Sequence, residues 1–192
     1  MSFYKDGKKV LSELDSYYNQ SINKEKPVIK QLTISELHEK LGLATHLKKG
    51  DLSDERIDSF IKEYLDNTTR LHHPGYFAHQ VGVPHPTGAL GSLIDGFTNN
   101  AMAIYEMGPA AAAIEFFMVN YLLEKIGWEP MPTDIKKRLT FFHGSGVLTH
   151  GGSLANMTAL LTARNCLDSS IREKGNPSDL VILAPETSHY SI

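Results

Sequence analysis

The sequence predicts an α/β protein in which a helical N-terminal arm precedes the start of a parallel β-sheet. Three observations support this class: amphipathic periodicity in the first 66 residues, a glycine-rich turn that opens a later helix, and short apolar segments flanking that helix. The apolar segments, residues 146–149 and 180–184, are typical of buried strands. Strand, helix and strand in this order form a βαβ unit, whose two strands are parallel.

The N-terminal arm is predicted to consist of short amphipathic helices. The first covers residues 10–18, and an extended stretch follows Pro27. Thr33 and Glu36 have the spacing of a capping box, which predicts that a second helix starts there. Ser53 is predicted to cap a third helix. The apolar face of that third helix contains Ile57, Phe60, Ile61, Tyr64 and Leu65.

A turn-rich stretch comes next, because prolines at 74, 84 and 86 block regular structure. A helix is then predicted over residues 89–99. Pro109 suits the first position of a further helix, residues 110–126, which is apolar on nearly all sides. Residues 150–153 form the glycine turn, and the helix between the two predicted strands covers residues 154–166.

Length and composition indicate one ordinary globular domain, or one domain with a helical extension. The chain has 192 residues, of which 41% are hydrophobic and 21% charged. A net charge of −3 argues against nucleic acid or an anionic membrane as the main partner. A single cysteine excludes an internal disulfide, and neither a secretory signal nor a long apolar run is seen. We expect a soluble, cytoplasmic chain.

Lysine and arginine are absent from residues 71–124. Solvent-exposed surfaces are normally rich in lysine, so a segment of this length without basic residues is expected to be buried. Two explanations remain open at this point. The segment packs against another subunit or further chain, or it forms the core of this domain.

The glycine turn is the strongest candidate for a binding site. Gly151 and Gly152 allow close approach of a ligand to the backbone, and Ser153 is expected to cap the helix and donate its hydroxyl proton. The positive end of the helix dipole favours a phosphate there. The alternative is a plain helix start without a ligand. The turn lacks the spacing of a P-loop or a Rossmann fingerprint.

Histidines offer a second set of candidates. His189 follows the second predicted strand, where open α/β sheets bind ligands, so it is placed to stack on a flat ring, to transfer protons or to hydrogen-bond a loop. Four more histidines lie in the proline-rich stretch, at 72, 73, 79 and 85. Their spacing matches no metal-binding motif, and we predict no metal site.

Three sequence blocks, in order, resemble the group II pyridoxal-phosphate-dependent amino-acid decarboxylases. They cover about residues 70–192 and begin with HHPGYFAHQVGVPHPTGALGSLIDGFTNNAMAIYEMGPAAAAIEFFMVNYL, followed by GVLTHGGSLANMTALLTARN and ETSHYSI. That family includes the glutamate, aromatic-amino-acid and diaminobutyrate decarboxylases. The resemblance implies an aspartate-aminotransferase-like (type I) fold, of which residues 1–86 are the helical arm and substrate loop and residues 87–192 the first part of the cofactor-binding large domain.

The resemblance also assigns roles to individual residues. Gly152 and Ser153 correspond to the turn that holds the phosphate of pyridoxal 5'-phosphate, and His189 to the histidine that stacks on the pyridine ring. Gln80 lies where glutamate-type members place a substrate-contacting glutamine. The family forms obligate dimers with the active site between subunits, which would make residues 71–124 interface and core.

Two family residues are missing from this sequence: the lysine that binds the cofactor covalently and the aspartate that pairs with the pyridine nitrogen. The expected function is therefore the N-terminal part of an L-amino-acid α-decarboxylase, inactive alone and paired with a second copy or a complementing C-terminal chain. The substrate within the family stays open. The alternatives are a non-catalytic association module and a phosphate- or nucleotide-binding βαβ domain.

Overall fold

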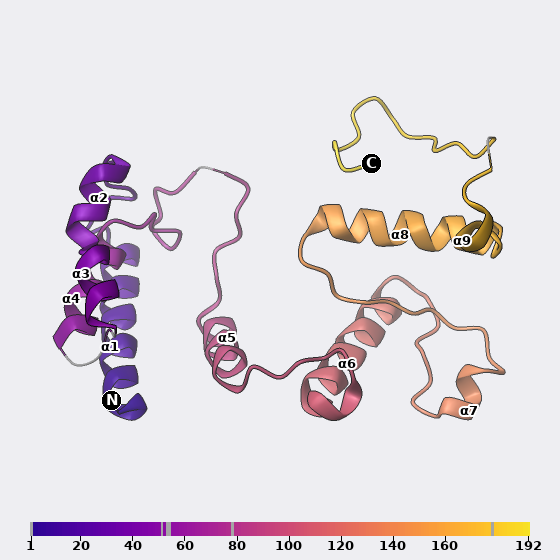
Figure 1. Ribbon diagram of the computed structural model, residues 1–192, viewed down its shortest axis with the longest axis horizontal. Coiled ribbons are helices and arrows are strands. Elements are labelled where there is room, and N and C mark those ends of the chain that lie inside the picture. The colour runs from indigo at the N-terminus through magenta and orange to yellow at the C-terminus, as the bar shows by residue number, and fades with distance from the viewer. Residues whose placement is uncertain (1, 51, 53–54, 78, 178) are drawn as a thin grey trace. The chain divides into compact units, whose positions relative to one another are not determined.

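The computed structural model describes residues 2–50, 52, 55–77, 79–177 and 179–192. The chain forms two compact units, Met1–Thr98 and Asn99–Ile192, and Figure 1 shows the helices of each. The domain boundary expected between residues 86 and 87 stays a prediction.

The first unit contains helices near all the positions that the sequence predicted. They are α1 (Phe3–Ile22), α2 (Ile34–Leu41), α3 (Leu43–Lys49), α4 (Glu55–Asp66) and α5 (Pro86–Thr98). Helix α1 extends beyond the predicted residues 10–18 because Ser2 caps it, accepting a hydrogen bond from the backbone N–H of Lys5 at 3.3 Å. Helix α3 was not predicted. It follows Gly42, whose left-handed backbone (φ 59°) ends α2. The predicted cap Ser53 lies outside the described residues.

The capping box of α2 is confirmed. The backbone N–H of Glu36 donates to Thr33 Oγ1 at 3.3 Å, and Glu36 Oε2 accepts hydrogen bonds from the Thr33 backbone N–H at 2.7 Å and hydroxyl at 2.8 Å. These bonds, first the one from the backbone, lower the pKa of the Glu36 carboxyl below its ordinary value of 4.5. The carboxylate half of the box is therefore strongest while Glu36 is ionised, whereas the bond from the Glu36 N–H to Thr33 does not depend on that charge.

Helix α2 is expected to fray at acidic pH. A lowered pKa in the folded state means that the stabilisation is fully present above pH 4.5 and is lost as the pH falls through the folded value. Amide chemical shifts of α2, followed by NMR from neutral pH downward, measure this loss. Thr33→Ala should make the helix frayed at every pH and remove the transition, whereas an unchanged transition in this variant would contradict the assignment to the box.

Helices α1 and α4 pack side by side and are joined by ion pairs at their edges. Lys9 Nζ lies 2.8 Å from Asp58 Oδ2, and Lys62 Nζ lies 3.4 Å from Glu13 Oε1. The apolar side chain of Leu65 is buried beneath them. Partly exposed ion pairs of this kind contribute little each, so burial of the apolar face is the main source of stability.

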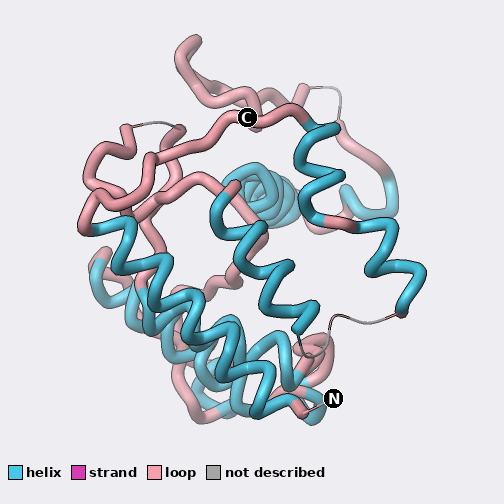
Figure 2. Tube along the Cα trace, turned by 90° about the vertical axis from the view of Figure 1, so that its left-hand side faces the viewer, coloured by secondary structure: helices cyan, strands magenta, loops and turns pink. Residues whose placement is uncertain are grey.

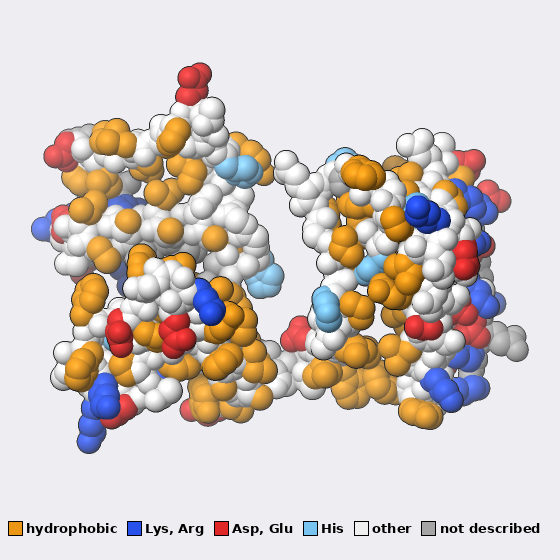
Figure 3. Space-filling view, turned by 180° about the vertical axis from the view of Figure 1, so that it is seen from behind, with side chains coloured by type: hydrophobic (Ala, Val, Ile, Leu, Met, Phe, Trp, Pro, Cys, Tyr) orange, Lys and Arg blue, Asp and Glu red, His pale blue; other side chains and the backbone are white. Residues whose placement is uncertain are grey.

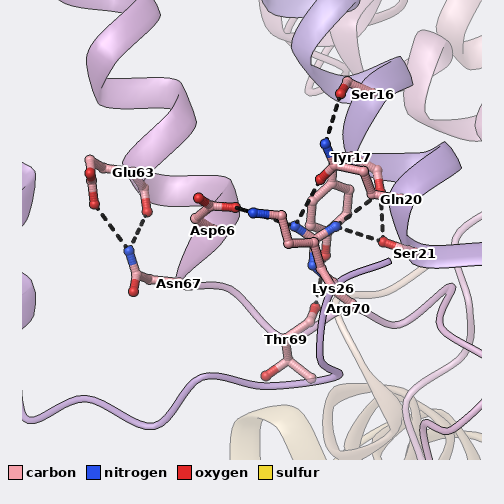
Figure 4. A network of polar contacts seen from close by, with 10 residues as sticks. All are labelled: Ser16, Tyr17, Gln20, Ser21, Lys26, Glu63, Asp66, Asn67, Thr69 and Arg70. Atoms are coloured by element: carbon pink, nitrogen blue, oxygen red, sulfur yellow. Dashed lines mark hydrogen bonds and ion pairs between the residues drawn. The ribbon is translucent and has the colours of Figure 1, made fainter. Parts of the chain in front are cut away.

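Arg70 makes several polar contacts at once, and only 2% of it is exposed. As Figure 4 shows, its guanidinium donates to the Tyr17 carbonyl and to Ser21 Oγ, both at 3.0 Å. Weaker contacts reach Gln20 and Asp66 at 3.5 Å. The guanidinium carbon also lies 4.3 Å from the centre of the Tyr17 ring. Arg70 thus joins the end of α1 to the segment that follows α4.

The second unit contains η1 (Tyr105–Met107), α6 (Pro109–Lys125), α7 (Ile135–Arg138), α8 (Gly152–Leu167) and α9 (Ile171–Lys174). Pro109 opens α6 as predicted. Short η1, α7 and α9 were not predicted, because each is only three or four residues long. Among the described residues of this unit, the buried apolar side chains are Leu123 of α6 and Ile171 of α9.

The predicted parallel sheet is wrong. Helices and loops make up all the residues that the structure describes, and none of these residues forms a strand (Figure 2). The helix between the two predicted strands is present as α8, but residues 146–149 and 180–184 have no regular structure. The α/β class, and the start of a parallel-sheet domain, are therefore replaced by a helical architecture.

Backbone pairing explains the correction. A strand requires a neighbour for its N–H and C=O groups, and two short parallel strands bury little. The N–H of Leu148 donates instead to Glu115 Oε1 of α6 at 2.8 Å. In the second segment Val181 and Leu183 are 74% and 94% exposed, so the expected burial on both faces does not occur. Apolar composition alone could not distinguish these segments from strands.

Large apolar side chains cover much of the surface (Figure 3). Every described residue from His79 to Met107 is exposed. The described part of residues 79–107, which lacks lysine and arginine, therefore does not form the core of the structure. Separately, none of the described helices is both long and apolar enough for a bilayer crossing.

Candidate functional site

The glycine turn lies at the start of α8, as the sequence predicted. Gly151 is the residue before the helix, with φ 96° and ψ 165°, and Gly152 is the first helical residue. The N–H of Gly151 donates to the Thr149 carbonyl at 3.0 Å, and its carbonyl accepts from the N–H of Ala155 at 3.2 Å. The dihedral angles of Gly151 belong to a region that essentially only glycine adopts. The turn therefore requires glycine at this position.

Ser153 does not cap the helix, contrary to the sequence prediction. The capping position is taken by Gly151, which has no side chain to accept a hydrogen bond from the first turn of α8. Ser153 is the second helical residue and is exposed. Its hydroxyl group belongs to the first turn of α8 and can donate to a ligand bound there.

The space and the donors around this turn fit a phosphate group. A Cβ atom added at Gly151 or Gly152 would meet no atom within 4 Å, so the backbone is open to close approach. The N–H groups of Gly152, Ser153 and Leu154 lie in the first helical turn, where an α-helix provides no carbonyl partner for them. These amides, one hydroxyl and the positive end of the helix dipole are suitable for an anion.

His189 lies in the last segment of the chain, which returns toward α8 (Figure 1). Its Nδ1 lies 2.7 Å from Ser191 Oγ, and the same hydroxyl accepts a hydrogen bond from Asn156 Nδ2 of α8 at 2.8 Å. Asn156 is four residues after Gly152, on the same side of the helix. The structure thus connects the predicted ring-binding residue to the helix that carries the predicted phosphate turn.

One face of the His189 ring is already in contact with an aromatic neighbour. The centre of the Tyr190 ring lies 4.0 Å from the imidazole centre, at an angle of 35°. Any further planar group must therefore stack on the opposite face. The sequence did not indicate that Asn156, Tyr190 and Ser191 belong to this site. Asn156 could have been found, because it lies one helical turn after the glycines.

Gln80 lies in the first unit and is exposed, beside an open hollow that His79 and Val81 also line. The other site residues, Gly151, Gly152, Ser153 and His189, lie in the second unit. The structure thus groups four of the five predicted site residues in one unit and leaves Gln80 in the other.

The loop that carries Gln80 is closed at its base by a hydrogen bond. His72 Nε2 lies 2.9 Å from the Pro84 carbonyl, so this nitrogen donates, and the His72 ring meets the Tyr18 ring edge-on at 5.0 Å between centres. Tyr18 belongs to α1, so the packed helices of the first unit position both ends of this loop.

His72→Phe is expected to loosen the loop while keeping the aromatic contact with Tyr18. The lost hydrogen bond is worth about 1 kcal/mol, which corresponds to roughly fivefold faster amide exchange within the loop. Hydrogen exchange of residues 75–77 and 79–83 measures the effect. His72→Gln, which retains a donor, serves as the control, and equal exchange in wild type and His72→Phe would show that the hydrogen bond does not close the loop.

Comparison with known proteins decides the family. The conserved domain of the pyridoxal-dependent decarboxylases matches residues 40–192, which is more than half of the chain. The chain belongs to the pyridoxal-dependent decarboxylase family. The family resemblance of the three sequence blocks is thereby confirmed.

Two relatives illustrate the range of this decarboxylase family. An L-2,4-diaminobutyrate decarboxylase of Acinetobacter baumannii is 22% identical over 76% of this chain and 29% of its own length. A glutamate decarboxylase-like protein of Gibberella zeae is 26% identical over 72% of this chain and 24% of its own length. The chain therefore spans less than a third of the length of these relatives.

In the parts of the chain that the structure describes, no three His, Cys, Asp or Glu side chains gather in an arrangement suited to a metal ion.

Proposed function

We propose that this chain provides the cofactor-binding turn and the ring-stacking histidine of a pyridoxal-phosphate-dependent L-amino-acid α-decarboxylase. The observation that carries the proposal is the link from His189 through Ser191 to Asn156, in a chain whose residues 40–192 match the family domain. This link brings a group suited to an aromatic ring to the helix whose start suits a phosphate.

The phosphate would be held at the start of α8. The amides of Gly152 and Ser153 donate to its oxygens, the Ser153 hydroxyl adds a further donor, and the helix dipole favours the negative charge. Gly151 gives the turn its shape and leaves room for the phosphate at the backbone. No cation is needed for this mode of binding, since the backbone supplies the donors.

His189 would contact the ring from the face opposite Tyr190. When bound, pyridoxal phosphate supplies an electron sink for loss of carbon dioxide from the α-carbon of an amino acid. The role of His189 is to keep the ring in place, and its hydrogen bond to Ser191 restricts rotation of the imidazole. Stacking of this kind contributes about 1 kcal/mol beyond the buried area.

Gln80 would orient the substrate amino acid. Its amide can both donate and accept, which suits a carboxylate or an amino group on a side chain. The names of the two relatives, one acting on diaminobutyrate and one glutamate decarboxylase-like, favour a substrate with a polar side chain. We further infer that the protein acts in the cytoplasm.

A homodimer would account for the exposed apolar surface. Residues 79–107 are exposed throughout, and the side chains of Leu90, Ile94 and Phe97 on α5 are at least half exposed. Apolar surface of this extent is typical of an interface between subunits. Sedimentation of the chain at several concentrations tests this part of the proposal separately from cofactor binding.

Cofactor binding is tested by thermal unfolding of the chain with pyridoxal phosphate, and in parallel with ATP, NAD and inorganic phosphate. A ligand that binds only the folded state raises the melting temperature. Pyridoxal phosphate should raise it more than inorganic phosphate at equal concentration, because only the former reaches His189. A larger rise with ATP or NAD would favour a nucleotide-binding site. No rise with any of them, together with self-association, would favour an association module.

A further inference from the structure

We infer that Asn156 and Ser191 are positioning residues that keep His189 Nδ1 as a hydrogen-bond acceptor, so that the proton of the neutral imidazole lies on Nε2. The inference is drawn from the hydrogen bonds around Nδ1. It rests on the proposed function only for the identity of the group that stacks on the imidazole. Both residues lie outside the predicted phosphate turn, and they act at the edge of the His189 ring, through Nδ1, and not at the face that is expected to stack on a ligand.

The backbone decides which nitrogen carries the proton. The N–H of Ser191 points to His189 Nδ1 at 3.3 Å, and a backbone amide can only donate. Nδ1 must therefore act as an acceptor, so it carries no proton. In a neutral imidazole the proton then sits on the other ring nitrogen, Nε2.

The Ser191 hydroxyl strengthens the same assignment. Asn156 Nδ2 carries only protons to donate, and it donates one to Ser191 Oγ at 2.8 Å. The hydroxyl proton of Ser191 is then directed to its other close neighbour, His189 Nδ1, at 2.7 Å. Asn156 thus occupies one acceptor position of the hydroxyl, and with Nδ1 as acceptor two donors, one from the side chain and one from the backbone of Ser191, meet at one nitrogen.

Two consequences follow for the ring. A proton on Nδ1 would face the backbone N–H of Ser191, which can only donate, so the arrangement disfavours the other neutral tautomer. The ring is also held against rotation, which keeps the face opposite Tyr190 available for stacking. Nε2–H is left as the outward donor, suited to an oxygen acceptor such as the carboxylate of an amino acid.

The tautomer is measured by NMR on the full chain labelled with ¹⁵N-histidine, without cofactor, at about pH 8, where an ordinary imidazole of pKa about 6.5 is neutral. Loss of one ring system in His189→Gln identifies the His189 signals among the nine histidines. Correlations with the ring carbon protons should show a protonated Nε2 and an unprotonated, hydrogen-bonded Nδ1. A proton on Nδ1 in the wild-type chain would overturn the inference.

Variants test the roles of the two positioning residues. In Ser191→Ala the Nδ1 signal should move toward that of an unbonded nitrogen, and in Asn156→Ala it should move in the same direction by less. Ser191→Thr, which keeps the hydroxyl, should restore the wild-type position. Ser188→Ala is the matched control, because Ser188 is joined to its surroundings through its backbone N–H, which donates to the Pro185 carbonyl.

Spectra of Ser191→Ala and Asn156→Ala that match the Ser188→Ala spectrum would overturn the positioning roles. The result does not depend on the cofactor. Failure of pyridoxal phosphate to bind would therefore reject the proposed function and leave the tautomer intact, whereas a wrong tautomer would reject this inference and leave cofactor binding unaffected.

Discussion

Replacing Gly151 with alanine is expected to weaken pyridoxal phosphate binding about 10- to 100-fold. Gly151 has φ 96° and ψ 165°, a conformation in which a side chain costs about 1–3 kcal/mol. A tenfold change in affinity corresponds to about 1.4 kcal/mol. Because an added Cβ meets no atom within 4 Å, the whole effect should come from the backbone, which would turn the first-turn amides of α8 away from the phosphate.

The matched control is Gly152→Ala. Gly152 is the first residue of α8, has no positive φ, and also has open space where the added methyl group would lie. This substitution should preserve the turn in the free chain. Equilibrium titration with pyridoxal phosphate, followed by its absorbance, compares the two variants. Equal affinity of Gly151→Ala and wild type would show that the turn does not hold the phosphate.

Arg70→Ala is expected to destabilise the first unit by about 3 kcal/mol. The substitution removes the two hydrogen bonds that the buried guanidinium donates to the Tyr17 carbonyl and to the Ser21 hydroxyl, although that hydroxyl still donates to the carbonyl at 2.6 Å. Hydrogen bonds to charged groups are worth about 1.5–3 kcal/mol each. The substitution also removes the cation–π contact with Tyr17. Burial raises the pKa of the Tyr17 hydroxyl and Arg70 opposes this rise, so loss of Arg70 should raise that pKa further.

Hydrogen exchange of α1 and α4 amides measures this loss in the first unit directly. Arg70→Lys should be intermediate, because a lysine keeps the charge but cannot reach all the acceptors of the planar guanidinium. Arg172→Ala, at an exposed position of α9, serves as the control and should leave the exchange unchanged. Exchange rates in Arg70→Ala equal to those of this control would show that the network contributes no stability.

Local signals explain why most helices could be predicted. The capping box at Thr33 and Glu36, and Pro109 at the first position of α6, act within one helical turn. The short helices α3, α7 and α9 escaped prediction because they have four to seven residues and too few positions for a period to appear. The turn at Gly151 and Gly152 was also predictable from a local signal, because the backbone conformation of Gly151 requires glycine at that position.

The sheet was mispredicted because strands are defined by partners and not by composition. Residues 146–149 and 180–184 have the apolar character of strands, yet the N–H of Leu148 pairs with Glu115 of α6. Such a pairing joins residues 33 positions apart and leaves no periodic trace in the sequence. Val181 and Leu183 are exposed and not buried as predicted, because burial depends on neighbouring elements that the local sequence does not specify.

Residue types at fixed short spacings were sufficient to indicate the family, the capping box at Thr33 and Glu36, Pro109 at the start of α6 and the glycine turn. The tertiary structure alone decided that Arg70 joins α1 to the segment after α4, and that Asn156 and Ser191 support His189. Arg70 and Tyr17 are 53 positions apart in the sequence, and Asn156 and Ser191 are 35 positions apart. Only folding of the backbone brings such donors and acceptors within hydrogen-bonding distance.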